Sequence, residues 1–440
     1  MIAFFVIFIL LAREVSSMEH SLMSAYAMDS STGEVVIDIN ADLSVIPASC
    51  LKIVTTGAAL HLLDPNSRFE THLEIDGEID DAGMLHGNII VKGGGDPCLG
   101  SDRIEGNPDW KRELEIWVDA VQACGIKEIE GDLIADATCF EKAMAAPSWS
   151  WEDLGNYYGA GASGLSFCEN KYEIFFKPGL YVGDDVTMLR TNPPFLGPLV
   201  IENELKTGPE NSGDRAWIFG SEFSQIQHIR GTIPFGVEEF SIKGAIPDPG
   251  LLVKLLFVRE LEERGIVLHG GKIEGNNCRK SIHVTYSPTI EEMIYWANQK
   301  SINLYTEHLL KKMGEGSALA GLQVVADFWR EKGVDWDGFY LADGSGLSRR
   351  NLVTAKGMGQ ILVIMKNSPF FSQFFASLRN HLDLITAKDG KMSFVKGYAG
   401  YTEHAVIVIF INHCADEKEA IESVKRVLLE VKTVRAGAKT

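Results

Sequence analysis

The segment PASCLKIVTTGAALHLL, residues 47–63, places Ser49 and Lys52 three positions apart at the start of a predicted helix. Pro47 stands just ahead of them, where helices commonly begin. An i to i+3 spacing brings a hydroxyl and an amine to one face of a helix. A serine becomes a good nucleophile when a neighbour takes its proton, and lysine serves as that base once burial and nearby cations lower its pKa. The pair therefore predicts a nucleophile with its base, although a serine cap followed by a surface lysine has the same spacing.

Two further short motifs carry polar groups that such a nucleophile needs. Ser301-Ile302-Asn303 opens a predicted helix, and its hydroxyl and amide suit the relay of a proton and the holding of a peptide bond. Lys388-Asp389-Gly390 stands on a predicted strand, where a fixed cation suits a substrate carboxylate. The alternatives are a helix cap for the first motif and an exposed turn for the second.

Strand patterns at the two ends of the chain predict one shared sheet. Residues 24–40 form a predicted strand pair around a Ser-Ser-Thr-Gly turn, and residues 392–402 and 405–413 form another. Between them, residues 290–367 have apolar residues at three- and four-residue spacing, which indicates helices. We expect a sheet built from both chain ends around a helical cluster. A final helix over residues 416–432 is expected to pack on this sheet, the alternative being a helix that lies on a membrane.

The middle of the chain has a different pattern. It contains many short strand-like runs, such as residues 71–79, and one predicted helix over residues 109–125. We therefore predict that residues 18–68 and 284–440 form one domain. Residues 69–283 are predicted to form a β-rich insert of two small domains.

Composition excludes several classes of function. The chain has 440 residues, of which 45% are hydrophobic and 23% charged, as is typical of a globular protein with ample core. Its net charge of −19 argues against a nucleic-acid partner, because phosphate binding needs concentrated Lys and Arg. The seven cysteines show no CxxC spacing and the eleven histidines no HExxH motif, so we expect neither a metal nor another cofactor. One disulfide, between Cys124 and Cys139, is conceivable, but buried thiols are favoured.

The first 17 residues have the pattern of an export signal. An apolar run from Phe4 to Ala12 precedes Val15 and Ser17, which are placed like the residues of a cleavage site. The run is too short for an ordinary membrane span, and a buried core segment is the alternative. We expect residues 1–17 to be a signal peptide that directs the protein to the periplasm or cell envelope. An uncleaved segment would act as a membrane tether.

Taken in order, SxxK, SxN and Lys-x-Gly resemble the motif triplet of penicillin-binding proteins and serine β-lactamases. Lys52 and Ser301 lie 249 positions apart, and this long insertion resembles the low-molecular-mass class C penicillin-binding proteins, the D-Ala-D-Ala carboxypeptidases of peptidase family S13. Nearly the whole chain takes part in the resemblance, from about Ala25 to Ile411. The segments that also look like family segments are PASCLKIVTTGAAL, VKGGGDPCL, GDLIADATCF, SWSWEDLGNYYGAGASGLS, SINLYTEHLLK and DGSGLSRRNLVT.

The resemblance implies an α/β, penicillin-recognising fold: an antiparallel sheet flanked by helices, with β-rich insertions. It implies a serine D-Ala-D-Ala carboxypeptidase or endopeptidase that acts on peptidoglycan stem peptides and is acylated by β-lactams. By position, Ser49 would be the nucleophile and Lys52 its base, while Ser301 and Asn303 would assist proton transfer and hold the substrate. Substrate binding would fall to Lys388, Asp389, Gly390 and Lys391, with the backbone N–H groups of Ser49 and Lys391 as the oxyanion hole.

One position departs from the family pattern. The family usually has Lys-Thr-Gly-Thr where this sequence has Lys388-Asp389-Gly390-Lys391. Asp389 should repel a substrate carboxylate unless it is protonated or paired, and Lys391 offers a charge to offset it. We therefore expect weakened recognition of a terminal carboxylate, with a shift toward endopeptidase action or toward low activity.

Other readings of the same residues stay open. A peptidoglycan-binding scaffold with a decayed site is favoured by Asp389 alone, and a β-lactamase would need an added deacylating carboxylate that the sequence does not identify. Four aromatic residues fit either a core or a cleft wall: Trp149, Trp151, Tyr157 and Tyr158. Glu152 or Asp153 would suit the ammonium of a diamino acid in the stem peptide, although exposed surface charge is the equal alternative.

Overall fold

The computed structural model describes residues 20–271, 273 and 279–438, which divide into two compact units. Unit 1 combines the chain up to Pro65 with Ile290–Gly314 and the chain from Ala318 onward. Unit 2 combines Asn66–Thr289 with Glu315–Ser317. The predicted signal peptide, residues 1–17, lies outside the described residues.

Unit 1 is an α/β structure. Its elements are β1 (Leu22–Asp29), β2 (Val35–Ile39), the 3₁₀ turn η1 (Ala48–Leu51), α2 (Lys52–Leu62), α6 (Ile290–Gln299), α7 (Asn303–Met313), α8 (Ala318–Glu331), α9 (Ala355–Lys366), α10 (Phe371–Ser377), β15 (Arg379–His381), β16 (Ile385–Met392), β17 (Val395–Tyr401), β18 (Ala405–Asn412) and α11 (Glu417–Ala438).

Both ends of the chain contribute to the sheet of unit 1. Its strand order is β15-β16-β17-β18-β1-β2, and each pair of neighbours is antiparallel. In the central pairing, Ala25 of β1 lies opposite Ile409 of β18. The prediction that the first and last strand pairs share one sheet is therefore confirmed.

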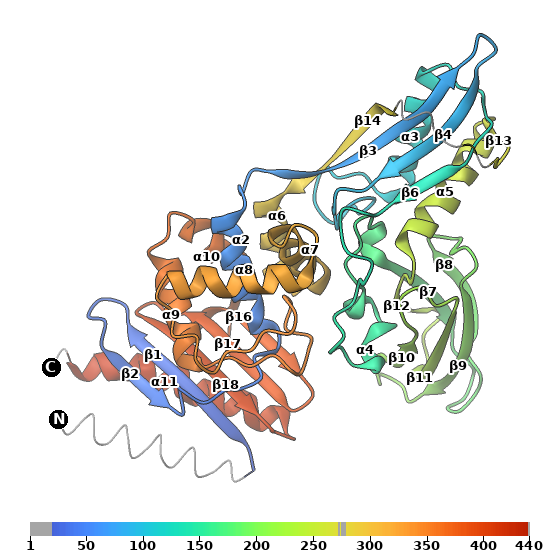
Figure 1. Cartoon of the computed structure of the whole chain (residues 1–440). Coiled ribbons are helices and arrows are strands. Elements are labelled where there is room, and N and C mark those ends of the chain that lie inside the picture. The colour runs from blue at the N-terminus through green and yellow to red at the C-terminus, as the bar shows by residue number, and fades with distance from the viewer. Residues whose placement is uncertain (1–19, 272, 274–278, 439–440) are drawn as a thin grey trace. The chain divides into compact units, whose positions relative to one another are not determined.

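Helices cover both faces of this sheet (Figure 1). α11 packs through Val424 and Leu428 on one face, against Ile407 and Ile409 of β18. α9 lies on the opposite face, where the ring of Tyr26 in β1 reaches it. Every residue of β17 and β18 is buried, as expected for strands covered on both sides. The predicted fold class is thus confirmed, and α11 packs on the sheet as expected.

Unit 2 is rich in strands. Its elements are β3 (Arg68–Ile79), β4 (Met84–Lys92), α3 (Trp110–Ala123), β5 (Glu128–Ile129), β6 (Leu133–Asp136), α4 (Trp151–Leu154), the 3₁₀ turns η2 (Tyr157–Gly159) and η3 (Cys168–Asn170), β7 (Lys171–Lys177), β8 (Thr187–Asn192), β9 (Val200–Gly208), β10 (Arg215–Phe219), β11 (Ile226–Pro234), β12 (Phe240–Ala245), α5 (Pro249–Glu263), β13 (Val267–Leu268) and β14 (Arg279–Thr289).

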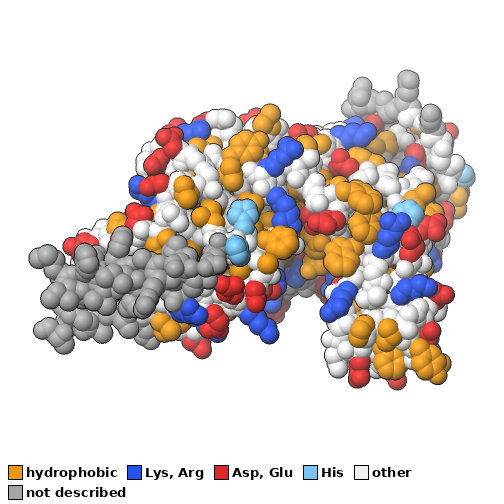
Figure 2. All heavy atoms as spheres, turned by 90° about the horizontal axis from the view of Figure 1, so that it is seen from below, with side chains coloured by type: hydrophobic (Ala, Val, Ile, Leu, Met, Phe, Trp, Pro, Cys, Tyr) orange, Lys and Arg blue, Asp and Glu red, His pale blue; other side chains and the backbone are white. Residues whose placement is uncertain are grey.

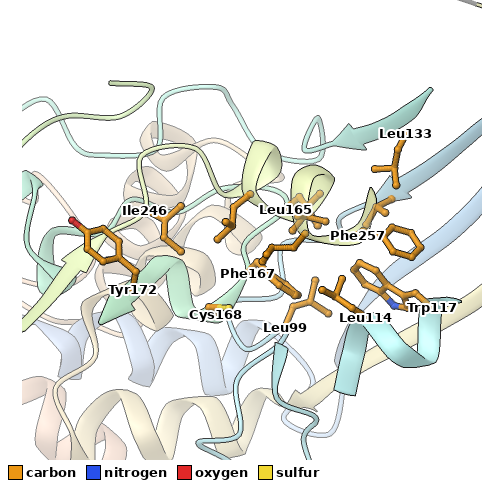
Figure 3. Close-up of a cluster of buried hydrophobic side chains, with 14 of the residues drawn as sticks. Leu99, Leu114, Trp117, Leu133, Leu165, Phe167, Cys168, Tyr172, Ile246 and Phe257 are labelled. Carbon is orange, nitrogen blue, oxygen red and sulfur yellow. The ribbon is translucent and has the colours of Figure 1, made fainter. Parts of the chain in front are cut away.

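Three sheets of unit 2 share one hydrophobic core. The large sheet has the order β13-β5-β4-β3-β14, with β6 paired to β4, and the two small sheets have the orders β12-β7-β8 and β10-β11-β9. Figure 3 shows part of the core, in which Trp117 of α3 meets Phe257 of α5 with ring centroids 5.3 Å apart. The same cluster extends to Tyr172 of β7 and Ile229 of β11.

One expectation about this region is wrong, and one alternative left open by the sequence is decided. Only one long helix was predicted here, whereas α5 is a second one of 15 residues. Its start is set by Asp248, whose side chain accepts a hydrogen bond from Leu251 N–H, and by Pro249 at the first position. In the described part of the chain, Cys124 and Cys139 keep separate thiols, so the conceivable disulfide is not formed.

The surface mixes charges of both signs. Figure 2 shows one face, on which acidic and basic side chains are interspersed. Among the described residues, no helix has an apolar stretch of the length that a membrane crossing requires.

Candidate active site

Ser49 and Lys52 lie at the junction of η1 and α2. The helix starts later than predicted, because its first turn is the 3₁₀ segment Ala48–Leu51. Ala48 has a φ of +48°, which is costly for a residue with a Cβ and is typical of a strained functional turn. The turn leaves Ser49 half-buried and brings its Oγ to 3.2 Å from Nζ of Lys52.

The Lys52 ammonium is surrounded by acceptors in a buried position. Its side chain has no exposed surface, and Nζ donates to Asn303 Oδ1 at 2.6 Å and to the carbonyl oxygen of Ser345 at 2.7 Å. Burial, and next the charge of nearby Lys388, lower the pKa of Lys52 to about 7. A large fraction of this amine is therefore neutral near pH 7, as a proton acceptor must be.

The second motif reaches the pair through Asn303. Asn303 begins α7, and its amide oxygen accepts a hydrogen bond from Nζ of Lys52. Ser301, two residues earlier, is half-buried and has a φ of +56°, so the backbone is strained here as well. The structure thus brings Asn303 of SxN to Lys52 of SxxK, although the two residues are 251 positions apart in the sequence.

A buried loop around Asp343 and Ser345, whose residues were not predicted as site residues, contacts Lys52 through the carbonyl oxygen of Ser345. Asp343 accepts hydrogen bonds from the N–H groups of Gly346 (2.8 Å) and Ser348 (2.6 Å), which shapes the loop that presents the Ser345 carbonyl. Glu307 of α7 accepts from Gly344 N–H at 3.1 Å, and burial followed by the charge of Asp343 raises the pKa of Glu307. Both residues lie in segments that resemble the family, DGSGLSRRN and SINLYTEHLLK, but roles were assigned there only to Ser301 and Asn303.

Strand β16 packs directly on η1 and so brings the third motif, Lys388-Asp389-Gly390, next to Ser49. Cys50 Sγ donates to the carbonyl oxygen of Lys388 at 3.3 Å. A Cβ at Gly390 would lie 2.5 Å from the carbonyl oxygen of Pro47, so only glycine permits this approach. Burial raises the pKa of Cys50 to about 12, which makes this thiol a packing group rather than a second nucleophile.

A substitution at Gly390 tests this contact. Gly390→Ala is expected to push β16 away from η1, with a loss of stability of about 1–3 kcal/mol from overpacking and at least a tenfold slower acylation by a β-lactam. The control is Gly250→Ala in α5, where the new Cβ would meet its nearest neighbours at an ordinary 3.6 Å. Thermal unfolding and stopped-flow acylation measure the two effects, and equal behaviour of the two variants would contradict the contact.

The charges of β16 are paired within the protein. Lys388 is buried, and its Nζ donates to the backbone oxygen of Asp389 at 2.7 Å and to Asp389 Oδ1 at 3.0 Å. Although burial favours the neutral acid, the Lys388 charge lowers the pKa of Asp389 to about 2. Lys391 does not offset Asp389 but binds Glu417 of α11 at 2.8 Å. Asp389 is thus an ionised, paired carboxylate.

The outer edge of β16 is available beside these groups. β15 pairs only with residues 385–387 of β16, and within the described residues no strand covers the same edge over residues 388–392. An open edge presents backbone N–H and C=O groups that an extended peptide can pair with. The site therefore combines a serine hydroxyl, a buried lysine amine, a side-chain amide and a strand edge that no described strand covers.

The aromatic residues singled out in the sequence separate into two groups in unit 2. Trp149 is buried at 6% exposure, which favours the core interpretation. Trp151 and Tyr157 are 60% and 53% exposed, so neither belongs to the core.

The antiparallel sheet between helical layers and the Ser49–Lys52–Asn303 centre define a protein of the penicillin-recognising class. The model of the D-Ala-D-Ala carboxypeptidase 3 (S13) family matches residues 11–379, so the chain belongs to this family. The match covers Ser49, Lys52, Ser301 and Asn303, and Lys388–Lys391 follow after its end.

Individual relatives agree with this assignment. A D-alanyl-D-alanine carboxypeptidase of Actinomadura sp. (strain R39) is 25% identical over 88% of this chain and 76% of its own length. The D-alanyl-D-alanine carboxypeptidase DacB of Haemophilus influenzae is 24% identical over 79% of this chain and 72% of its own.

The solved structures agree as well. The crystal structure of penicillin-binding protein 4 (dacB) from Haemophilus influenzae matches with a TM-score of 0.80 at 21% identity, over 96% of this chain and 98% of that one. A second structure of that protein, complexed with a β-lactam, has a TM-score of 0.76. At this level of identity, the structural likeness concerns the fold.

Proposed function

We propose that the chain is a penicillin-binding D-Ala-D-Ala peptidase that cleaves peptidoglycan stem peptides through an acyl-enzyme on Ser49. The family membership and the names of the relatives support the substrate class. The single observation that carries the mechanism is the buried Lys52 amine, which reaches both Ser49 Oγ and Asn303 Oδ1.

Acylation follows from these contacts. A stem peptide lies antiparallel along the open edge of β16, and neutral Lys52 takes the proton of Ser49 as Oγ attacks the carbonyl between the two D-alanines. The backbone N–H groups of Ser49 and Lys391 are the proposed donors to the oxyanion, a stabilisation of roughly 3–4 kcal/mol per donor by precedent. The proton then passes by way of Ser301 to the leaving amine, and the C–N bond breaks.

Hydrolysis of the acyl-enzyme reverses the roles. A water molecule gives its proton to Lys52 and attacks the ester carbonyl, after which Ser49 recovers its hydrogen and the shortened peptide leaves. A β-lactam follows the same first step, but its ring-opened product stays attached to Ser49 and blocks the water. We propose that this chemistry takes place in the periplasm or cell envelope, which the predicted signal peptide supports.

Substrate choice depends on Asp389. Lys388 carries the charge that would hold a terminal carboxylate, yet its ammonium is already paired with Asp389. The pair has no net charge, so a free carboxylate gains little there. We propose that cross-links, or leaving groups without a free carboxylate, are cut in preference to terminal D-alanine.

Asp389→Thr is expected to raise carboxypeptidase turnover about tenfold, equivalent to about 1.4 kcal/mol in the barrier, because it frees Lys388 and restores a hydroxyl. Release of D-alanine from a soluble pentapeptide measures the effect. Asp389→Asn is the matched control, since it removes the charge without supplying a hydroxyl of threonine's size. Unchanged turnover in Asp389→Thr would sink the explanation.

One experiment distinguishes the proposed peptidase from a decayed scaffold and from a β-lactamase. Purified cell wall is digested with the wild type and with Ser49→Ala, and the products are separated. If the chain is an active peptidase, the wild type releases D-alanine, or monomers from cross-linked dimers, and Ser49→Ala releases neither. If it is a scaffold with a decayed site, neither protein releases these products. A β-lactamase would instead hydrolyse penicillin rapidly and leave the wall intact.

A further inference from the structure

One sheet of unit 2 has an outer face that is unusual for solvent-exposed strands. In the sheet β10-β11-β9, Ile218, Leu205 and Ile229 point into the core and are at most 2% exposed. The opposite face of β10 carries Trp217, which is 44% exposed, and Phe219. Large exposed aromatic side chains on a sheet that already has a buried face call for a partner.

A second element extends this aromatic surface. Trp151 of α4 stacks on Phe219 with ring centroids 4.7 Å apart and an angle of 33° between the rings, yet 60% of its residue surface is exposed. The Arg230 guanidinium also lies over the ring of Phe219, 5.7 Å from its centroid. Trp151, Phe219 and Trp217 thus form one surface, which we call the aromatic platform. Its residues stand on strand β10 and on the short helix α4.

Several charged side chains near the platform are paired with one another. Glu204 of β9 accepts from Arg230 at 3.1 Å and contacts His228 at 3.2 Å. Lys206, two positions after Glu204 in β9, is paired with Asp185. These ion pairs leave hydrogen-bonding groups in place, and the exposed Glu152 and Glu202 add negative charge, so a neutral polar ligand suits this face better than a polyanion.

We infer that the aromatic platform binds the glycan strand of peptidoglycan. The C–H groups of a pyranose ring are weakly positive and stack on the negative face of an aromatic ring. The paired charges at its rim offer donors and acceptors to hydroxyl and acetamido groups. The choice of glycan rests on the proposed function, because the stem peptides that the serine centre cleaves are attached to that polymer.

The test uses peptide-free glycan strands, prepared by amidase digestion of cell wall and then esterified at the lactyl carboxylates that the digestion leaves, so that the strands are neutral, and the full chain carrying Ser49→Ala. We expect the strands to bind this protein, and Trp151→Ala with Trp217→Ala to weaken binding at least tenfold in calorimetry. Because Ser49→Ala cannot turn over, this result does not depend on the proposed peptidase function. A failure of that function would leave wall digestion absent and strand binding intact.

Control variants separate a lost ring from lost folding. Trp217→Phe keeps an aromatic face and should retain most binding, whereas Trp217→Leu should lose it. Tyr181→Ala removes a ring that is 73% exposed elsewhere in unit 2 and should bind as the parent does. In the active chain, the double variant should be acylated by penicillin at the parental rate but digest intact wall more slowly. Unaltered strand binding by the double variant, or binding that disappears in 0.5 M salt, would overturn the inference.

Discussion

Benzylpenicillin will add one drug mass to the wild-type chain, and proteolytic mapping will place it on Ser49. The Ser49→Ala variant will carry no adduct, and its turnover of stem peptides will fall on the order of 10⁴-fold or more, as for other serine nucleophiles. The physical reason is that, within the site, only Ser49 Oγ lies beside the buried amine of Lys52. Intact-mass spectrometry after a short incubation measures the adduct.

The neighbouring thiol provides the control for this result. Cys50 is adjacent to Ser49 but buried, with its pKa raised to about 12, so Cys50→Ala should be acylated like the wild type. An adduct that maps to another residue, or one that persists in Ser49→Ala, would remove Ser49 from the mechanism. Rapid release of hydrolysed drug would instead favour a β-lactamase.

Acylation will speed up as the pH rises through about 7, and Lys52→Ala will acylate on the order of 10²- to 10⁴-fold more slowly. Only the neutral amine can accept the Ser49 proton, and Lys52 is mostly protonated below its pKa of about 7 and mostly neutral above it. The rate therefore increases from pH 6 to pH 8. Stopped-flow acylation with a chromogenic β-lactam across this range measures the profile.

A second variant checks that the midpoint belongs to Lys52. The Glu307 charge raises the pKa of Lys52, so Glu307→Gln should move the midpoint of the profile to lower pH. Lys52→Arg is the matched control, because it keeps a cation that cannot lose its proton. A profile that is flat between pH 6 and pH 8, or one that Glu307→Gln leaves in place, would contradict a lysine base.

Much of the fold could be predicted because local patterns of apolar and polar residues indicate its strands and helices. The alternation of apolar and polar residues around Ala25 and the apolar run at Ile409 identified strands. Their pairing was predicted because strand pairs at both ends of the chain can be buried together in one sheet. Helix α5 escaped because its apolar residues lie among many strand-like runs, although its Asp248 cap and Pro249 marked its start. Sheet order in unit 2 depends on long-range contacts, which no short pattern encodes.

The candidate site divides in the same way. Ser49, Lys52 and Asn303 were named from their motifs, and the structure joins them through contacts at 3.2 and 2.6 Å. The support from Asp343 could not be derived, because a buried loop carboxylate has no periodic signature. The partner of Asp389 could not be predicted either. Whether the Asp389 charge repels a ligand depends on the direction of the Lys388 ammonium, which the sequence does not give.

The pairing of β1 with β18 has a consequence for biosynthesis. Leu22 lies opposite Asn412, so the pairing that joins the two halves of the sheet cannot form until the last strand has been made. The serine is made early, but the strand that carries Lys388 emerges more than 300 residues later. Such non-local pairing is slow to form. The hydrolase is therefore expected to be inactive while it is being synthesised and to assemble its active site only after synthesis is complete.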